Sequence, residues 1–283
     1  MSASVEFYRE AYETFMDPVQ RNVRAEAFGT DIGQNSWLTS DELDAFARWL
    51  GLTPNQHVLD VACGSGGPSL YLSRKAQCRV SGIDNDSQSI DVAKKMAAND
   101  VRGCHSVFSV ADARQRLPFD DGVFDALVCI DSVNHLANRC TVFAEWNRVL
   151  RTGGRALFTD PVVVTGPVTS EELASRSIPG DFVFAPEFTN ERLITRAGFR
   201  VLRQQDSTRN AEAVSNRWRA ARQAFRKDLV KLEGEEQFER LQRFFGAAQK
   251  LAMQRRLSRI VYLVEKQLEV VPASADDVIL DAA

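Results

Sequence analysis

The sequence predicts an α/β fold: a Rossmann-like, doubly wound sheet of seven mostly parallel strands with helical cap insertions. From His57 to Thr159, strand-like stretches alternate with helix-like stretches through short links, which is typical of an open α/β sheet. Runs such as HVLDVAC (57–63) are almost continuously apolar, as expected of a parallel strand that is buried on both faces. A length of 283 residues suits one large domain, or a core with an elaborated cap.

Each expected strand is a short apolar run bounded by polar or small residues. These runs predict strands over 57–63, 79–84, 106–112, 124–131, 155–161, 199–207 and 259–266. Between them, helix-like stretches cover 68–77, 87–100, 138–150 and 189–198. Pro68 suits the first turn of its helix, Ser87 is expected to cap the following helix, and the TGG run (152–154) ends the third.

The segments outside this alternation divide the chain into a core and caps. The expected division is an N-terminal helical cap or lid, a nucleoside-binding core, a cap insertion, a return to the core, a helical cap insertion, and a last strand with a loosely held tail. The corresponding ranges are 1–50, 51–161, 162–187, 188–208, 209–258 and 259–283. Both insertions should emerge at the carboxyl ends of the strands, where open α/β sheets bind ligands.

Composition narrows the class of protein. A net charge of −3 with 26% charged residues provides no global attraction to nucleic acid or to an anionic membrane, and the apolar runs are too short to span a bilayer. The start, MSASVEFYREAYETF, lacks the basic and apolar regions of a signal peptide. Five cysteines without CxxC pairing and three dispersed histidines predict a cytoplasmic protein with reduced thiols and no metal site.

The stretch LDVACGSGGPSLYL (59–72) reads as a strand, a turn and a helix. Gly64 and Gly66 permit a sharp turn and let a ligand lie against the main chain, beside the unpaired N–H groups of the helix start. Asp84 follows Gly64 by 20 residues, at a strand end where acids accept hydrogen bonds from ribose hydroxyls. Asp112 ends the next strand, where it or its backbone could contact an adenine edge.

The alternative for this turn is a tight bend without any ligand. Acids at three successive strand ends, Asp60, Asp84 and Asp112, favour a nucleoside site instead. The dinucleotide fingerprint requires a glycine at position 69, and this chain has Ser69 there. The pattern therefore disfavours a hydride-transfer cofactor.

The DVACGSG motif resembles the first motif of the class I S-adenosylmethionine-dependent methyltransferases. The resemblance continues through GIDND (82–86), VADARQRLPFDDGVFDALVCIDSVNHL (110–136) and EWNRVLRTGGRALFTDP (145–161), and so covers roughly residues 55–160. Among these enzymes it is similar to the ubiquinone/menaquinone and glycine/sarcosine-type small-molecule methyltransferases. It implies S-adenosylmethionine as cofactor, S-adenosylhomocysteine as product and a small-molecule acceptor, with homo-oligomerisation left open.

The resemblance also implies a role for each matching residue. The methionine moiety would be held by Asp60 and the backbone of Ala62, Gly64 and Gly66. Contacts to the ribose and adenine would come from Asp84, Asn85, Ala111, Asp112 and Ala113. The methionine end and the reacting methyl would be faced by Asp131, Ser132 and His135. Closure over the cofactor would come from the irregular N-terminal link, through Gln34 and Trp37.

His135 is the candidate general base, because an unperturbed histidine titrates near neutrality. A base is needed only when the acceptor must lose a proton, as a hydroxyl does, and the alternative is a histidine that bonds the backbone or lines the cofactor site. Asp160 could contact a substrate cation or cap a turn. The alternating aromatics Phe182, Phe184 and Phe188 could line an apolar acceptor pocket or form an ordinary lid core.

Three function classes follow from these features. The first is a small-molecule methyltransferase acting on oxygen or nitrogen, or on carbon. The second, a nucleic-acid methyltransferase, is disfavoured because IDSVNH (130–135) stands where an Asn/Asp-Pro-Pro-aromatic motif is expected, and because the basic run 209–229 has apolar residues at the helical spacing of an amphipathic helix. The third is a non-catalytic binding module, which the intact glycine turn and its acids disfavour.

Overall fold

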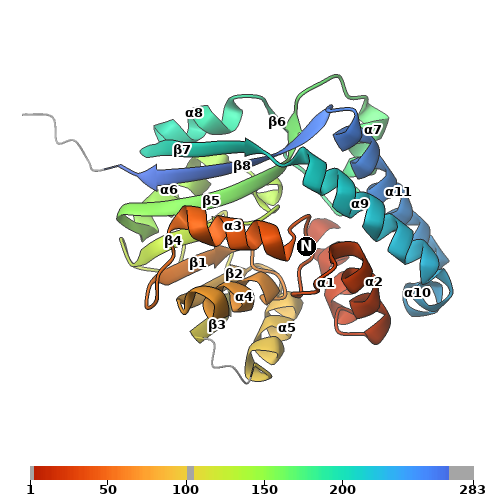
Figure 1. Cartoon of the computed structure of the whole chain (residues 1–283). Helices are drawn as coiled ribbons and strands as arrows, with labels where there is room; N and C mark the ends of the chain where they lie inside the picture. Colours follow the sequence, from red (N-terminus) through yellow and green to blue (C-terminus); the bar gives the residue numbers. More distant parts are fainter. Residues whose placement is uncertain (1–2, 101–104, 268–283) are drawn as a thin grey trace, which may run out of the picture.

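The sheet follows the predicted alternation closely. The computed structural model describes residues 3–100 and 105–267, so the expected tail over 268–283 lies outside the described residues. Its main strands are β1 (His57–Val61), β2 (Arg79–Asp84), β3 (His105–Val110), β4 (Phe124–Cys129), β5 (Leu150–Val164), β7 (Phe199–Asp206) and β8 (Leu257–Lys266), with a short β6 (Ala185–Pro186). Their order is β3-β2-β1-β4-β5-β8-β7, and β6 pairs with β5 outside this path (Figure 1).

The sheet is mostly parallel, as the sequence predicts. β8 runs antiparallel to both β5 and β7, whereas β1 to β5 pair in parallel. All seven predicted strands are present, and the two-residue β6 is the unpredicted one. β5 begins at Leu150 and continues to Val164, so it takes in the TGG run and extends into the segment expected to be an insertion. Its pairing with β8, which reaches Val164 and Leu257, accounts for this extension.

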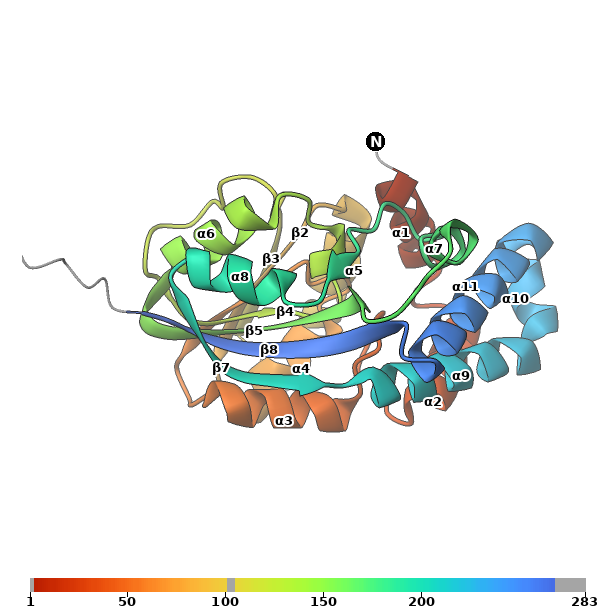
Figure 2. The ribbon, with the colours of Figure 1, turned by 90° about the horizontal axis from the view of Figure 1, so that it is seen from above.

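Helices cover both faces of the sheet. The helices are α1 (Ala3–Glu13), α2 (Pro18–Phe28), α3 (Ser40–Leu50), α4 (Gly67–Ala76), α5 (Ser87–Ala98), the 3-10 turn η1 (Val133–His135), α6 (Arg139–Val149), α7 (Ser170–Arg176), α8 (Thr189–Arg196), α9 (Thr208–Ala224), α10 (Arg226–Glu233) and α11 (Glu235–Met253). α3 and α4 lie on one face, and α6 and α8 on the other (Figure 2). The α5 helix starts with Asp86 rather than the expected Ser87 as its cap, because the Asp86 carboxylate accepts from the Ser89 N–H at 2.8 Å.

Helix α3 packs on a face of the sheet and is part of the core, whereas the sequence analysis assigned residues 1–50 to a cap. Leu43 and Phe46 of α3 pack in one apolar cluster with Val58 of β1, Leu157 of β5 and Val261 of β8. The hydrophobic stripe of α3 is therefore satisfied by the sheet face. Only α1, α2 and the link that follows them remain at the carboxyl ends of the strands.

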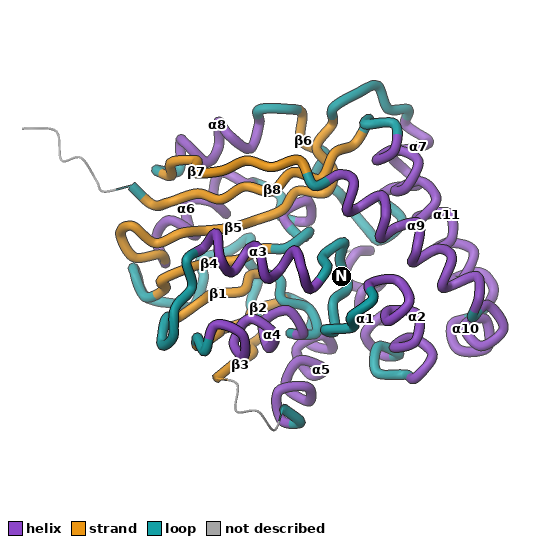
Figure 3. Tube along the Cα trace, in the orientation of Figure 1, coloured by secondary structure: helices purple, strands orange, loops and turns teal. Residues whose placement is uncertain are grey.

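The remaining helices form a cap at the carboxyl ends of the parallel strands. Figure 3 shows α1, α2, α7, α9, α10 and α11 gathered at that end of the sheet. The run 209–229 is amphipathic as predicted: Val214, Ala221 and Leu229 are buried in clusters with α2 and α11. Within the described part of the chain, no helix has both the length and the apolar content to cross a membrane.

Candidate active site

Two adjoining cavities lie where the cap meets the carboxyl ends of the strands. The smaller, about 140 Å³, is lined by the glycine turn and by the ends of β1, β2, β3 and β4. The larger, about 490 Å³, lies among the cap helices and is rich in aromatic rings. The two cavities share a wall made of Tyr8, Asn35, Ser36, Asp131 and His135.

The turn after β1 needs its glycines for space as well as for conformation. Gly64 and Gly66 have φ values of 54° and 73°, which disfavour residues with a side chain. A Cβ on Gly64 would lie 2.3 Å from the Tyr12 hydroxyl, and one on Gly66 would lie 2.6 Å from the Phe108 ring. Ala62 and Gly64 line the smaller cavity, whereas Gly66 does not; Gly66 instead permits the turn and the close packing beneath it.

Two carboxylates, the buried Asp60 and the half-buried Asp84, lie beside this turn. Asp60 accepts a hydrogen bond from the Ser69 hydroxyl at 2.5 Å, and Asp84 accepts from the N–H groups of Gly64 at 2.9 Å and Asp86 at 3.0 Å. Burial raises the pKa of Asp84 and raises that of Asp60 to about 7. Each carboxylate retains lone pairs for a ligand's donors. The hydrogen bond to Asp60 also explains why position 69 is serine rather than glycine.

The end of β3 forms the next part of the smaller cavity. Asn85, Ala111, Asp112 and Ala113 all line it, as the sequence predicted for neighbours of an adenine. Arg114 was not predicted: its guanidinium binds the Asp112 carboxylate at 2.8 Å and lowers the pKa of Asp112. A ligand amino group would therefore share the Asp112 carboxylate with Arg114.

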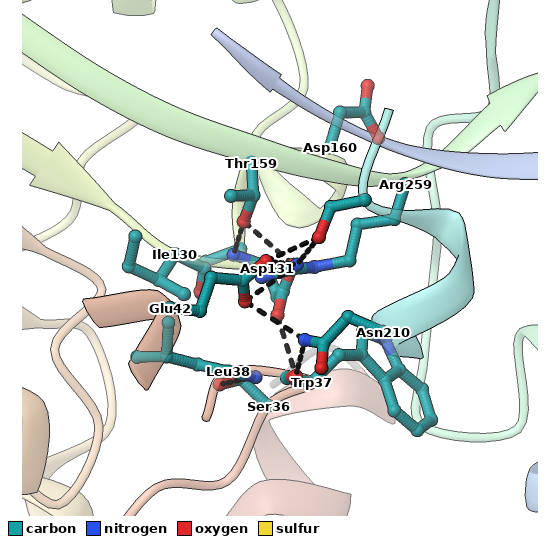
Figure 4. A network of polar contacts seen from close by, with 12 residues as sticks. Ser36, Trp37, Leu38, Glu42, Ile130, Asp131, Thr159, Asp160, Asn210 and Arg259 are labelled. Carbon is teal, nitrogen blue, oxygen red and sulfur yellow. Dashed lines mark hydrogen bonds and ion pairs between the residues drawn. The ribbon is translucent and has the colours of Figure 1, made fainter. Parts of the chain in front are cut away.

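Asp131 holds the wall between the cavities in place (Figure 4). One carboxylate oxygen accepts from Arg259 and from the Thr159 hydroxyl, both at 2.7 Å, and the other accepts from the Trp37 N–H at 2.9 Å. Arg259 is fully buried and also binds Glu42 at 2.7 Å. Strand β8 and helix α3 thus fix Asp131, which in turn anchors the N-terminal link.

The N-terminal link reaches the site through other residues than those predicted. Gln34 is fully buried, and its amide is bonded to the backbone of Ile32 at 2.8 Å and of Thr30 at 3.2 Å. It lines neither cavity, so the expectation that it closes over the cofactor is corrected. Trp37 lines the larger cavity only, while Ser132, as expected, lines the smaller one.

His135 lies at the junction of the two cavities. Its Nε2 is 3.2 Å from the Tyr8 hydroxyl, and its ring packs edge-on against Phe182 with centroids 4.7 Å apart. Burial, together with the charge of Arg176, lowers the pKa of His135 to about 4. The imidazole is therefore neutral near pH 7, and the lowered pKa makes it a weaker base than an ordinary histidine.

The other open alternatives are resolved by packing. Asp160 is buried, binds Arg139 at 2.6 Å and accepts from the Val162 N–H at 3.1 Å; it caps a turn and lines neither cavity. Phe182 lines the larger cavity, Phe184 packs within the cap, and Phe188 is exposed. Among residues 3–100 and 105–267, no group of His, Cys, Asp and Glu is placed to hold a metal ion.

Sequence reasoning missed the residues that α1 and the link bring to the site. Tyr8, Tyr12, Asn35 and Ser36 all line the smaller cavity. Tyr8 meets His135 across 127 positions of sequence, and no local pattern encodes such a contact. In the sequence, the acids and tyrosines of the N-terminal stretch are the feature that could have drawn attention to helix α1 as part of the site.

Asp60 predicts a specific dependence of stability on pH. Its carboxyl ionises near pH 4 in an unfolded chain but holds its proton to about pH 7 in the folded protein, so the folded state binds more protons between these values. The stabilising contribution of that proton is complete below about pH 4 and declines by an amount on the order of 2–4 kcal/mol as the pH rises through about 7.

Urea unfolding of the wild type and Asp60→Asn, each at about pH 5 and about pH 8, checks this. The comparison isolates Asp60 because the variant removes only the titration of this carboxyl. Other groups stay in both proteins, among them His135, whose lowered pKa acts in the opposite sense. We expect the free energy of unfolding to fall more with pH in the wild type than in the variant. An identical pH dependence in both proteins would contradict the assignment.

The comparisons with known proteins agree on one family. The family described as "Methyltransferase domain" matches residues 59–158. Over 132 residues the chain is 36% identical to the sarcosine/dimethylglycine N-methyltransferase of Halorhodospira halochloris, covering 46% of each chain. It is 32% identical over 133 residues to the 27-O-demethylrifamycin SV methyltransferase of Amycolatopsis mediterranei, covering 47% of this chain and 48% of that protein.

A solved structure extends the likeness to the whole fold. The cyclopropane synthase MmaA2 of Mycobacterium tuberculosis matches with a TM-score of 0.76 at 17% identity, over 94% of this chain and 99% of that one. The chain spans about half the length of the two curated relatives it matches. The matched region 59–158 contains the glycine turn and the acids at the strand ends. Residues 59–158 therefore form a methyltransferase domain, in agreement with the resemblance of its motifs to the class I S-adenosylmethionine-dependent methyltransferases.

Proposed function

We propose that the protein transfers the methyl group of S-adenosylmethionine to an oxygen or nitrogen of a small-molecule acceptor. The observation that carries this proposal is the shared wall of the two cavities. An acid-rich cavity at the glycine turn meets an aromatic cavity at Tyr8, Asp131 and His135. A methyl donor in the first and an acceptor in the second would meet beside a neutral imidazole.

The residues of the smaller cavity fit this cofactor chemically. S-adenosylmethionine carries ribose hydroxyls, an ammonium group and an adenine amino group, all hydrogen-bond donors. Burial raises the pKa of both Asp60 and Asp84, and hydrogen-bond donors from a ligand would relieve the cost of keeping these carboxylates charged. S-adenosylmethionine supplies the transferable methyl group when bound.

The small volume of this cavity and its contact with helix α1 bear on how the ligand enters. The smaller cavity, at about 140 Å³, is below the roughly 300–1,000 Å³ of typical ligand pockets. Tyr8 and Tyr12 of α1 form part of its lining. We infer that α1 moves outward to admit the cofactor and returns to exclude water, which a displacement reaction requires.

The protein itself would align the donor and the acceptor, keep water out of the site and accept a proton. Asp131 fixes the wall between donor and acceptor, so that the reacting atoms can be held in line. His135 accepts the proton of an acceptor hydroxyl or ammonium, while the neighbouring Tyr8 stays protonated because burial raises its pKa. The aromatic lining of the larger cavity keeps bulk water away from the acceptor.

The named relatives support this class of acceptor. Their names describe methylation of sarcosine or dimethylglycine and of a rifamycin, which favours a small molecule over nucleic acid. A cytoplasmic location is consistent with Cys63, Cys78, Cys129 and Cys140 being free thiols. We include neither a membrane partner nor a fixed oligomeric state in the proposal.

Two measurements test the proposed function in sequence. Calorimetry with S-adenosylhomocysteine should show binding, and the absence of binding at millimolar ligand would refute the cofactor site. The protein is then incubated with methyl-labelled S-adenosylmethionine and the small-molecule fraction of a cell extract. We expect a labelled small molecule; cofactor binding with label found only in nucleic acid would assign the chain to the other class.

A further inference from the structure

Arg176, at the end of α7, is a buried cation that lies among aromatic rings. Its side chain is only 3% exposed, and it lines the larger cavity. The guanidinium lies over three rings, 4.9 Å from the centroid of Phe244, 5.1 Å from Phe182 and 5.4 Å from Trp37. Among the described residues none forms a hydrogen bond or an ion pair with it. Cation–π contacts hold it in place and leave its N–H groups available.

The neighbouring carboxylates are already bound to other arginines. Asp131 is held by Arg259 at 2.7 Å, and Asp160 by Arg139 at 2.6 Å. Burial lowers the pKa of Arg176 to about 10, which still leaves it charged near pH 7. A buried charge without a hydrogen-bonded partner destabilises the folded protein. A bound anion would therefore offset the desolvation cost of the Arg176 guanidinium.

We propose that Arg176 binds a carboxylate of the methyl acceptor, which is then an aromatic or large apolar carboxylic acid. The inference rests on the proposed function, because it assigns the larger cavity to the acceptor. The planar guanidinium offers two parallel N–H groups that match a carboxylate. Phe182 contacts both Arg176 and His135, so the anchored acid and the proton acceptor face the same part of the cavity.

The other arginines of this cavity favour a carboxylate over a phosphate. Each of them is engaged by a neighbour: Arg24 by Asp31, Arg222 by Glu233, and Arg240 by Gln237. A phosphate normally collects several donors or cations, and among the described residues that line this cavity only Arg176 has a guanidinium with no hydrogen-bonded neighbour. Aromatic rings, among them Phe182, Trp218 and Phe244, form one part of the lining and suit the apolar body of the acid, while acids such as Glu13 and Glu236 line another part.

The test uses three small probes on the full chain saturated with S-adenosylhomocysteine. The probes are 3-phenylpropionate, its neutral amide and phenyl phosphate, and calorimetry measures their affinities. Because a charge-assisted hydrogen bond outweighs a neutral one, we expect the carboxylate to bind at least about tenfold more tightly than the amide. Arg176→Gln should remove this preference, and the matched control Arg240→Gln, in the same lining, should retain it.

The outcomes separate this inference from the proposed function. Failure of the wild type to bind S-adenosylhomocysteine defeats the proposed function itself. Normal binding of that ligand with equal affinity for amide and carboxylate overturns the role of Arg176 alone, and a preference for phenyl phosphate overturns the assignment to a carboxylate. If Arg176→Gln does not fold, the wild-type preference and its weakening in Arg176→Lys decide the question.

Discussion

Replacing His135 by alanine is expected to lower the turnover number for a hydroxyl acceptor by about 10²–10⁴-fold, the usual contribution of a positioned general base. The neutral imidazole at the junction of the cavities is the group placed to take the proton, and its Nε2 is 3.2 Å from the Tyr8 hydroxyl. Affinity for S-adenosylhomocysteine should stay nearly unchanged, because the ligand's carboxylate partners, Asp60 and Asp84, remain. Single-turnover rates with labelled cofactor and calorimetry measure the two effects separately.

The pH profile provides an independent reading of the same residue. With the pKa of His135 lowered to about 4, the base form persists down to that pH and is lost only below it. The wild-type kcat/KM should therefore show no loss from this group between about pH 8 and pH 5. His105→Ala, which changes an exposed histidine at the start of β3, is the control; equal activity of His135→Ala and this control would contradict the assignment.

Replacing Asp84 by alanine is expected to weaken binding of S-adenosylhomocysteine by about two to four orders of magnitude. Two hydrogen bonds from ribose hydroxyls to a charged acceptor are each worth about 1.5–3 kcal/mol, and about 1.4 kcal/mol is a tenfold change in affinity. The substitution also removes the acceptor of the Gly64 and Asp86 N–H groups, which loosens the glycine turn. Calorimetry gives the change in affinity directly.

Two further variants separate binding from folding at this site. Asp84→Asn keeps an acceptor oxygen at the turn and should lose less affinity than alanine. Asp121→Asn, at an exposed carboxylate paired with Arg148, should bind as tightly as the wild type. A folded Asp84→Ala protein with unchanged affinity would mean that the ribose lies elsewhere.

Local patterns predicted the parts of this protein that depend on neighbours in sequence. The apolar runs marked the central strands β1, β4, β5 and β8, because a strand buried on both faces must be apolar along its length. The edge strands β3 and β7 are largely exposed and were marked by their place in the strand–helix alternation. Gly64 and Asp84 were identifiable because a sharp turn and a strand end each demand a residue type at a fixed spacing. The parallel order of β1, β2 and β4 then brings these positions together at one edge.

The misplaced residues all depended on contacts between distant segments. Gln34 looked available in an irregular link, yet its amide is used by the backbone of Ile32 and Thr30. Residues 40–50 looked like part of a lid, but their apolar stripe matches the sheet face and packs there. A hydrophobic helix face predicts burial without saying against which partner.

The sequence by itself determined the sheet, the glycine turn, the acids at the strand ends and the methyltransferase domain of residues 59–158, since each follows from residue type at short spacing. Only the tertiary structure decided which groups meet in the cavities: Tyr8 with His135, Arg259 with Asp131, and Arg176 with three aromatic rings. These pairings join segments from both ends of the chain through packing of the cap. Such packing depends on the complementarity of whole surfaces, which no single stretch of sequence contains.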